Sequence, residues 1–211
     1  GLDSAGELLQ AVTDHRITEQ EVDERVEELL KAAFTYPESS KETKRKLEGQ
    51  KDLLYQEHHE LAEQAAEESM VLMKNDGNLL PLSFGQKIGI IGDFAFQPRF
   101  QGAGSSSVNA IRVEKVAECI GKTDFTLLGM EKGYLRNGKE DKKLENDALK
   151  LAERADVILY FLGLGEQEES EGIDRTSINI PQNQLSLLHK IARQKKEVVA
   201  VSYTHLRAHE T

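Results

Sequence analysis

Four short apolar segments alternate with helical patterns between residues 87 and 201, and this alternation most constrains the fold. Strands that are apolar on both faces need helices on both sides, which is typical of a parallel sheet. The sequence therefore predicts an α/β domain with a mostly parallel sheet. The expected strands are 87–92, 125–128, 157–162 and 198–201, and the expected helices between them are 113–119, 144–155 and 183–195.

The first 35 residues indicate two short amphipathic helices, the second of which begins at Thr18. Thr18 and Glu21 have the spacing of a capping box, in which each residue satisfies a backbone donor of the other. Two such helices cannot bury their apolar faces on each other alone, so we expect them to dock on a larger body upstream.

The polar stretch from residue 36 to about residue 56 contains a charge run and predicts a linker that is helical in part. A long helix with a stripe of small residues is expected to follow over residues 61–73. Asn75, Asp76 and Gly77 would then end this helix, because Asn and Gly are common at helix C-termini.

The formal net charge of −10 argues against nucleic acid and against an anionic membrane as partners, and leaves neutral ligands open. The sequence contains no apolar run of about 18 residues that would span a bilayer. Cys119, the single cysteine, cannot form an internal disulfide, which permits a reducing compartment and slightly favours the cytoplasm. The sequence begins without Met or a signal-like segment, so we expect the true N-terminus to be missing.

A glycine-rich loop follows the first expected strand and includes Arg99, Gln101, Gly102 and Gly104. Glycines permit close backbone approach, so a phosphate cradle is one interpretation. The loop lacks the Lys of a P-loop and the third glycine of a dinucleotide fingerprint. A nucleotide-binding or flavodoxin-like module therefore remains the weaker alternative.

An acidic loop follows the third expected strand, with five carboxylates in the nine residues from Glu166 to Asp174. Such a cluster is often only a solvated loop. Its place at the carboxyl end of a strand, next to Arg175, instead favours a ligand site. A carboxyl group near other negative charge can serve as a general acid. The spacing does not fit an EF-hand, the histidines lack ligand-spaced companions, and we expect neither metal nor cofactor.

Four segments together resemble glycoside hydrolase family 3, and in particular its β-glucosidase branch. Residues 67–82 are similar to the start of that family's second domain, and residues 99–106 are similar to a loop of the branch. Residues 169–176, with Ile180, Pro181 and Gln184, resemble its acid/base loop, and residues 1–34 resemble the closing helices of its barrel.

The resemblance implies an incomplete α/β sandwich preceded by helices from the end of a (β/α)8-type barrel. On this basis residues 1–35 are the closing helices of the barrel, 36–78 the linker and long helix, and 79–201 the truncated sandwich. Residues 202–211 depart from the family and are similar to translated adapter DNA, so we expect a non-native tail. The sheet would then lack its later strands.

The resemblance also implies a retaining mechanism with two carboxylates. The nucleophile is an Asp of the barrel and is expected to be absent from this chain, so the fragment alone should be inactive. Glu171 is the expected acid/base, with Glu169 as the fallback, because the acidic run makes the register easy to shift. Asp174 and Arg175 are expected to organise the loop. Arg99, Gln101 and Gly102 are expected to lie near the substrate.

The expected partners are a small oligosaccharide or an aryl or alkyl β-glycoside, and a barrel domain in the same protein. The sugar itself is not derivable, because most of its subsite belongs to the barrel. The acidic loop favours a β-glucosidase over an N-acetylglucosaminidase. A noncatalytic sugar-binding domain that kept the fold is the second alternative.

Overall fold

The computed structural model describes residues 4–105 and 107–203. The chain divides into two compact units, Gly1–Val71 and Leu72–Thr211, and each is described by itself.

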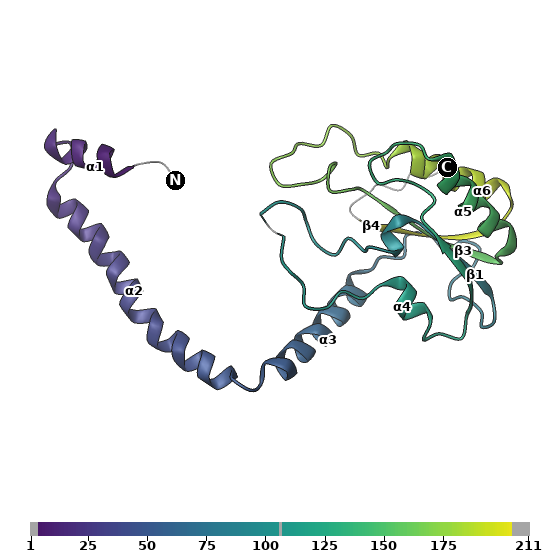
Figure 1. Ribbon diagram of the computed structural model, residues 1–211, viewed down its shortest axis with the longest axis horizontal. Helices are drawn as coiled ribbons and strands as arrows, with labels where there is room; N and C mark the ends of the chain where they lie inside the picture. Colours follow the sequence, from purple (N-terminus) through teal and green to yellow (C-terminus); the bar gives the residue numbers. More distant parts are fainter. Residues whose placement is uncertain (1–3, 106, 204–211) are drawn as a thin grey trace. The chain divides into compact units, whose positions relative to one another are not determined.

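The first unit consists of helices α1 (Ser4–Thr13), α2 (Glu19–Leu47) and α3 (Lys51–Ser69) (Figure 1). The predicted capping box at the start of α2 is confirmed: the Glu21 amide donates to Thr18 Oγ1 at 3.2 Å, and the Thr18 amide donates to Glu21 Oε2 at 2.8 Å. Neither α1 nor α3 contains a buried residue among those the structure describes. Apolar side chains of this unit are exposed, among them Leu29 and Phe34.

The predicted helix boundaries in this part of the chain are wrong, and the expected linker is helical except at residues 48–50. Helix α2 continues through Pro37 to Leu47, because residues 41–47 are mostly good helix formers and ion pairs such as Lys46 to Glu42 support these later turns. Helix α3 ends at Ser69, before the predicted stop, where Met70 turns to extended backbone. Asn75 instead closes a turn, since its side chain both donates to and accepts from the backbone of Leu80.

The second unit contains a four-stranded, wholly parallel sheet in the order β2-β1-β3-β4. The predicted α/β class and the four predicted strands are confirmed. The strands are β1 (Lys87–Ile91), β2 (Thr126–Glu131), β3 (Val157–Gly163) and β4 (Glu197–Tyr203). Ser202 and Tyr203, which were assigned to the tail, lie in β4, and residues 204–211 of that tail lie outside the described residues.

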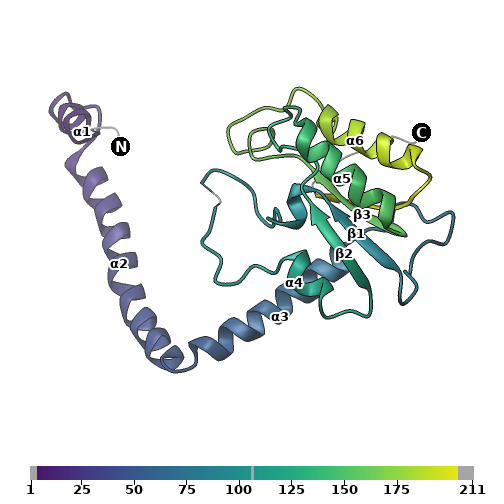
Figure 2. The ribbon, with the colours of Figure 1, turned by 45° about the vertical axis from the view of Figure 1, so that its right-hand side comes forward.

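Helices cover both faces of this sheet. A short 3-10 turn, η1 (Asp93–Ala95), follows β1 and leads towards α4 (Val116–Ile120), which lies on the opposite side of the sheet from α5 (Lys142–Arg154) and α6 (Gln182–Arg193) (Figure 2). This arrangement follows from right-handed crossovers that run from β1 to β2 and then back across β1 to β3. The two central strands are therefore apolar on both faces, and Ile90 of β1 pairs with Leu159 of β3.

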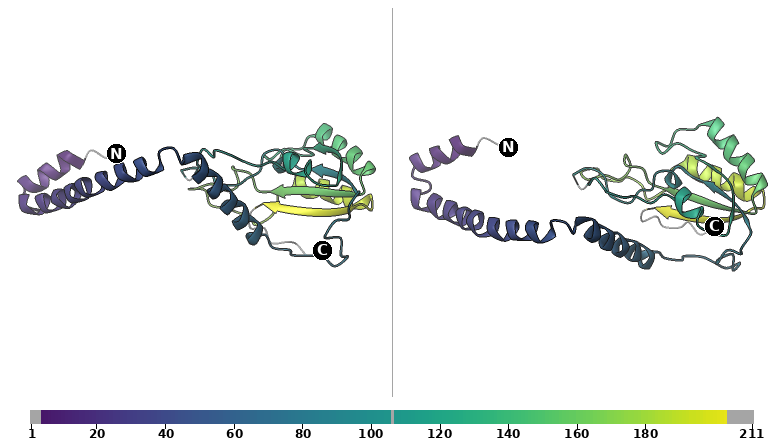
Figure 3. Two further views of the ribbon diagram at one scale, coloured as in Figure 1. Left: turned by 90° about the horizontal axis from the view of Figure 1, so that it is seen from below. Right: turned by 60° about the horizontal axis from the view of Figure 1, so that its bottom comes forward.

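The strand order produces a topological switch point between β1 and β3. The chain leaves β1 towards β2 on one side and leaves β3 towards β4 on the other, so the loops after β1 and β3 diverge from adjacent strand ends. Figure 3 shows these loops at the end of the sheet to which the arrows of β3 and β4 point. Ligands of open α/β sheets bind at such a point, and both loops singled out in the sequence meet there.

None of the described helices combines the length and the apolar composition needed to cross a bilayer.

Candidate active site

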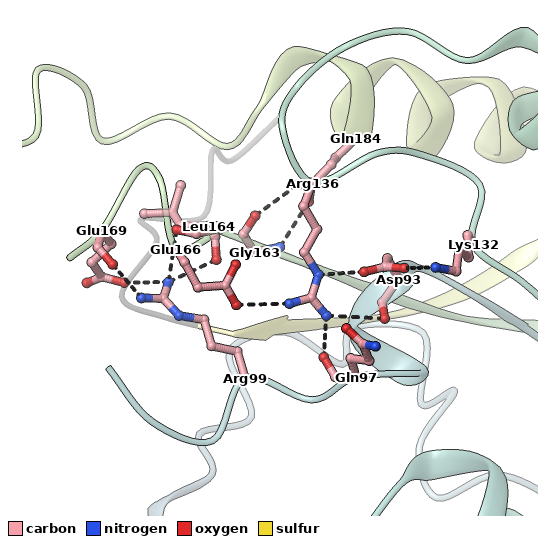
Figure 4. Close-up of polar contacts among 11 residues, drawn as sticks. Asp93, Gln97, Arg99, Lys132, Arg136, Gly163, Leu164, Glu166, Glu169 and Gln184 are labelled. Atoms are coloured by element: carbon pink, nitrogen blue, oxygen red, sulfur yellow. Dashed lines mark hydrogen bonds and ion pairs between the residues drawn. The ribbon is translucent and has the colours of Figure 1, made fainter. Parts of the chain in front are cut away.

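Arg99 joins the two loops of the switch point. Its side chain is only 5% exposed, although it comes from the irregular segment after η1. Nη1 donates to the carbonyls of Leu164 and Gly165 at 2.9 and 3.4 Å and to Glu169 Oε2 at 2.9 Å, while Nη2 donates to the Glu169 carbonyl at 2.7 Å. Figure 4 shows this guanidinium lying within the turn that follows β3.

Glu171 lies farther along the same loop and contacts the glycine-rich loop. The Ser105 amide donates to Glu171 Oε2 at 3.1 Å, and the Ser105 hydroxyl donates to the same oxygen. The Glu171 amide donates to the Ala103 carbonyl at 3.4 Å. A Cβ atom added at Gly104, which has φ +91°, would lie 3.2 Å from the Cβ of Glu171. Small residues in the glycine-rich loop therefore permit the close approach of this carboxylate.

The glycine-rich loop does not form the predicted alternative of a phosphate cradle. Helix α4 begins only at Val116, so the loop does not open onto a helix N-terminus as phosphate-binding loops do. The Ser105 amide already donates to a carboxylate. Gln101 closes the loop, since its side chain accepts from and donates to the backbone of Val108 at 2.8 and 3.1 Å. Gly102 is exposed beside it.

The remaining predicted residues lie on the outer part of the acidic loop. Asp174 is exposed and Arg175 is half-buried. Within the described ranges, Nη2 of Arg175 is buried without a hydrogen-bond partner. Their expected role as loop organisers remains a prediction, whereas the contacts of Arg99 hold the first part of this loop.

A network of charged residues that the sequence analysis missed lies beside Arg99 (Figure 4). Asp93, which is 8% exposed, accepts from Lys132 Nζ at 2.8 Å and from Arg136 Nε at 2.5 Å. Arg136 also reaches Glu166 at 3.1 Å and donates to the carbonyl of Gln97. Its guanidinium lies 4.2 Å from the centroid of the Phe94 ring. The signal available in the sequence was Asp93, which directly follows the first strand.

Gln184, at the start of α6, fixes the end of β3. It is fully buried, and its amide group exchanges two hydrogen bonds of 2.9 Å with the backbone of Gly163. Gly163 is the last residue of β3, so these bonds set the point at which the acidic loop leaves the sheet. In the sequence, only the family resemblance pointed to Gln184.

Two buried tyrosines support the same strand end. The Tyr134 hydroxyl donates to the Phe161 carbonyl at 2.6 Å, and the Tyr160 hydroxyl donates to the Gln184 carbonyl at 2.7 Å. Burial raises the pKa of both tyrosines far above the usual value. These hydroxyls are therefore neutral hydrogen-bond donors of the framework, not proton-transfer groups.

Across the described ranges, no three His, Cys, Asp or Glu side chains are grouped so that they could hold a metal ion. The chemistry that the geometry permits is that of carboxylates at the switch point, with arginines that neutralise some of them.

Residues 70–207 match the family model of the glycosyl hydrolase family 3 C-terminal domain. The chain belongs to glycoside hydrolase family 3. The match covers the whole parallel sheet and both switch-point loops, so the α/β unit is the C-terminal domain of this family.

Curated relatives are glycosidases of the same family. The chain is 39% identical over 197 residues to thermostable beta-glucosidase B of Acetivibrio thermocellus, a match that covers 92% of the chain and 25% of that protein. It is also 39% identical over 160 residues to an exo-alpha-(1->6)-L-arabinopyranosidase of Bifidobacterium breve, covering 68% of the chain and 20% of that relative. The chain thus spans about a quarter or less of the length of these relatives.

Solved structures of family 3 enzymes share this fold. The family 3 beta-glucosidase of Bifidobacterium adolescentis superposes with a TM-score of 0.72 at 30% identity, covering 96% of this chain and 29% of that one. Beta-glucosidase 3B of Thermotoga neapolitana gives a TM-score of 0.62 at 18% identity, covering 95% and 31%. The second likeness shows the fold alone. The predicted family and fold class are confirmed.

Proposed function

We propose that this chain contributes the acid/base loop of a retaining β-glucosidase-type glycoside hydrolase, with Glu171 as the acid/base. The observation that carries the proposal is the place of Glu171 at the switch point, where loops from the two central strands meet. An exposed carboxylate at that edge can meet a substrate held by another domain.

The contacts of Glu169 support the choice of Glu171 over the fallback. The Glu169 carboxylate is paired with Arg99, whose guanidinium is almost entirely buried. This ion pair holds the Glu169 carboxylate inside the turn after β3, so it is not free to approach a leaving group. The Glu171 carboxylate instead accepts from the uncharged amide and hydroxyl of Ser105, and the residue is exposed, so a substrate can reach it.

The mechanism has two steps, and this chain supplies one of its two carboxylates. Glu171 gives its proton to the leaving glycosidic oxygen while an Asp of the barrel domain attacks the anomeric carbon and forms a covalent glycosyl ester. Glu171, now ionised, then takes a proton from the water that cleaves the ester. Both inversions together retain the anomeric configuration. Asp174 and Arg175 take no part in these proton transfers.

The proposed substrates are small oligosaccharides or aryl and alkyl glycosides that end in a β-linked glucosyl residue. The similarity to thermostable beta-glucosidase B, which extends over 92% of the chain, supports glucose as the sugar. Other relatives are named for arabinopyranosyl and xylosyl bonds, so related pentopyranosides belong in the same substrate panel.

Glu171→Gln and Glu169→Gln in the whole enzyme, which joins this chain to a barrel domain, test the proposal. General-acid help contributes about 10²- to 10⁴-fold, and it matters most when the leaving group is poor. Glu171→Gln should therefore lower kcat/KM for an alkyl β-glucoside by about 100-fold or more, and far less for a dinitrophenyl β-glucoside. Glu169→Gln should lower both values by a similar factor.

The opposite pattern would be a larger loss of kcat/KM on the alkyl β-glucoside than on the dinitrophenyl β-glucoside in Glu169→Gln only. This result would assign the acid/base role to Glu169. No glycosidase activity in the unchanged protein, together with measurable sugar binding, would favour the noncatalytic sugar-binding alternative.

A further inference from the structure

The turn after β3 determines the position of the acid/base loop. The backbone hydrogen bonds of this turn hold its conformation only weakly. The amides of Glu168 and Glu169 both donate to the Gly165 carbonyl, at 3.3 and 3.2 Å. These two long bonds close one helical turn between the last residues of β3 and the segment that carries Glu171. A turn of this kind needs further contacts to stay in one conformation.

Arg99 supplies such contacts at both ends of the turn. One nitrogen reaches the carbonyls of Leu164 and Gly165 where the turn begins, and the other reaches the carbonyl of Glu169 where it ends. The carboxylate of Glu169 pairs with the same guanidinium. A planar, permanently charged fork can join several acceptors at once, which a lysine ammonium cannot do in the same geometry.

Arg99 also lies on the loop that receives Glu171. Four residues beyond Arg99, the Ala103 carbonyl accepts from the Glu171 amide, and Ser105 then donates to the carboxylate. The two loops are therefore held together on both sides of Glu169: before it by the Arg99 guanidinium, and after it by the contacts of Ala103 and Ser105 with Glu171. Because the Arg99 side chain is 5% exposed, it offers no surface to a substrate.

We propose that Arg99 is a positioning residue for the acid/base: by bridging the two ends of the turn at Gly165 to Glu169, it sets where the Glu171 carboxylate meets the leaving group. This inference rests on the proposed function of Glu171. It assigns to Arg99 an action through the loop, whereas the sequence predicted only that Arg99 lies near the substrate.

The test is Arg99→Lys in the whole enzyme, with Arg112→Lys as the matched control. Arg112 is on the same loop, is about half exposed and pairs with Glu114 at the surface. For each variant, kcat/KM is measured on an alkyl β-glucoside and on a dinitrophenyl β-glucoside. The ratio of the two values cancels the fraction of correctly folded enzyme, so partial misfolding of a variant cannot imitate the expected result.

Arg99→Lys should lower the alkyl-to-dinitrophenyl ratio by about tenfold or more, as part of the 10²- to 10⁴-fold that a well-placed general acid contributes. Arg112→Lys should leave the ratio unchanged. Equal losses on both substrates in Arg99→Lys would overturn the inference, because Arg99 would then only support the fold.

Glu171→Gln, measured in the same series, separates the two proposals. A selective loss in Glu171→Gln with an unchanged ratio in Arg99→Lys would refute the role of Arg99 alone. An unchanged ratio in Glu171→Gln would refute the proposed function, and the role of Arg99 would fall with it.

Discussion

At the scale of single residues, long-range hydrogen bonds of buried polar groups fix the edge of the sheet that carries the site. Gln184 and Arg99 each satisfy backbone groups more than twenty positions away in the sequence. A periodic pattern reports which positions face the core, and it contains no signal for which backbone group a polar side chain will meet. This is why the sequence led to Arg99 as a residue near the substrate, with no sign of its backbone partners, and missed Arg136.

Gln184→Leu should destabilise the α/β unit. The substitution keeps much of the buried volume but leaves the amide and the carbonyl of Gly163 without their partner, and each unsatisfied group costs about 1–3 kcal/mol. The free energy of unfolding from urea titration measures the effect. Gln182→Leu, at the exposed first position of α6, is the control and should change it by less than about 0.5 kcal/mol. Equal effects of the two substitutions would contradict this account of Gln184.

At the scale of elements, the sequence predicted the parallel strands well because they are buried on both faces. Residues such as Ile90 and Ile158 are fully buried, so these strands are continuous apolar runs that stand out in the sequence. The helices of the first unit were harder to delimit, since their exposed faces leave boundaries to weak local preferences. Pro37 and Asn75 are the residues where those preferences misled the prediction.

The close pairing of β1 with β3 explains a glycine at the switch point. Gly92 has φ +127°, and a Cβ atom there would lie 2.1 Å from the Phe161 carbonyl oxygen. Gly92→Ala should therefore lower the free energy of unfolding by about 3 kcal/mol or more, through backbone strain and overpacking together. Gly138, with φ +75° and open space around it, is the matched control.

Gly138→Ala should lower the free energy of unfolding by about 1–2 kcal/mol, because only the strain of the left-handed conformation is added. Thermal or urea unfolding of both variants measures the difference. A Gly92→Ala variant no less stable than Gly138→Ala would show that the strand ends are not packed as closely as described.

At the scale of the whole molecule, the two units differ in what stabilises them. The α/β unit has a buried core around β1 and β3. Helices α1 and α3 have no buried residue among those described. Isolated helices of this kind are marginal in water. For the first 35 residues the sequence predicted the need for a larger partner, because two short amphipathic helices cannot bury their apolar faces on each other alone.

Hydrogen exchange on the 211-residue chain should show this difference directly. Amides of α1 and α3 are expected to exchange at least about 100-fold faster than amides of β1 and β3, which open only with the unit as a whole. Mass spectrometry of peptic fragments measures both sets in one sample. Equal protection of the helices and the central strands would contradict the description.

The central claim is that Glu171 is the acid/base of a retaining glycosidase, and azide rescue of Glu171→Ala in the whole enzyme tests it most directly. Azide attacks the covalent glycosyl ester without needing a general base. With a dinitrophenyl β-glucoside, azide should raise the turnover of Glu171→Ala by about tenfold or more, towards the 10²- to 10⁴-fold that the missing base contributes, and the product should be the β-glucosyl azide. Unchanged turnover in azide, or formation of the α-azide, would contradict the claim.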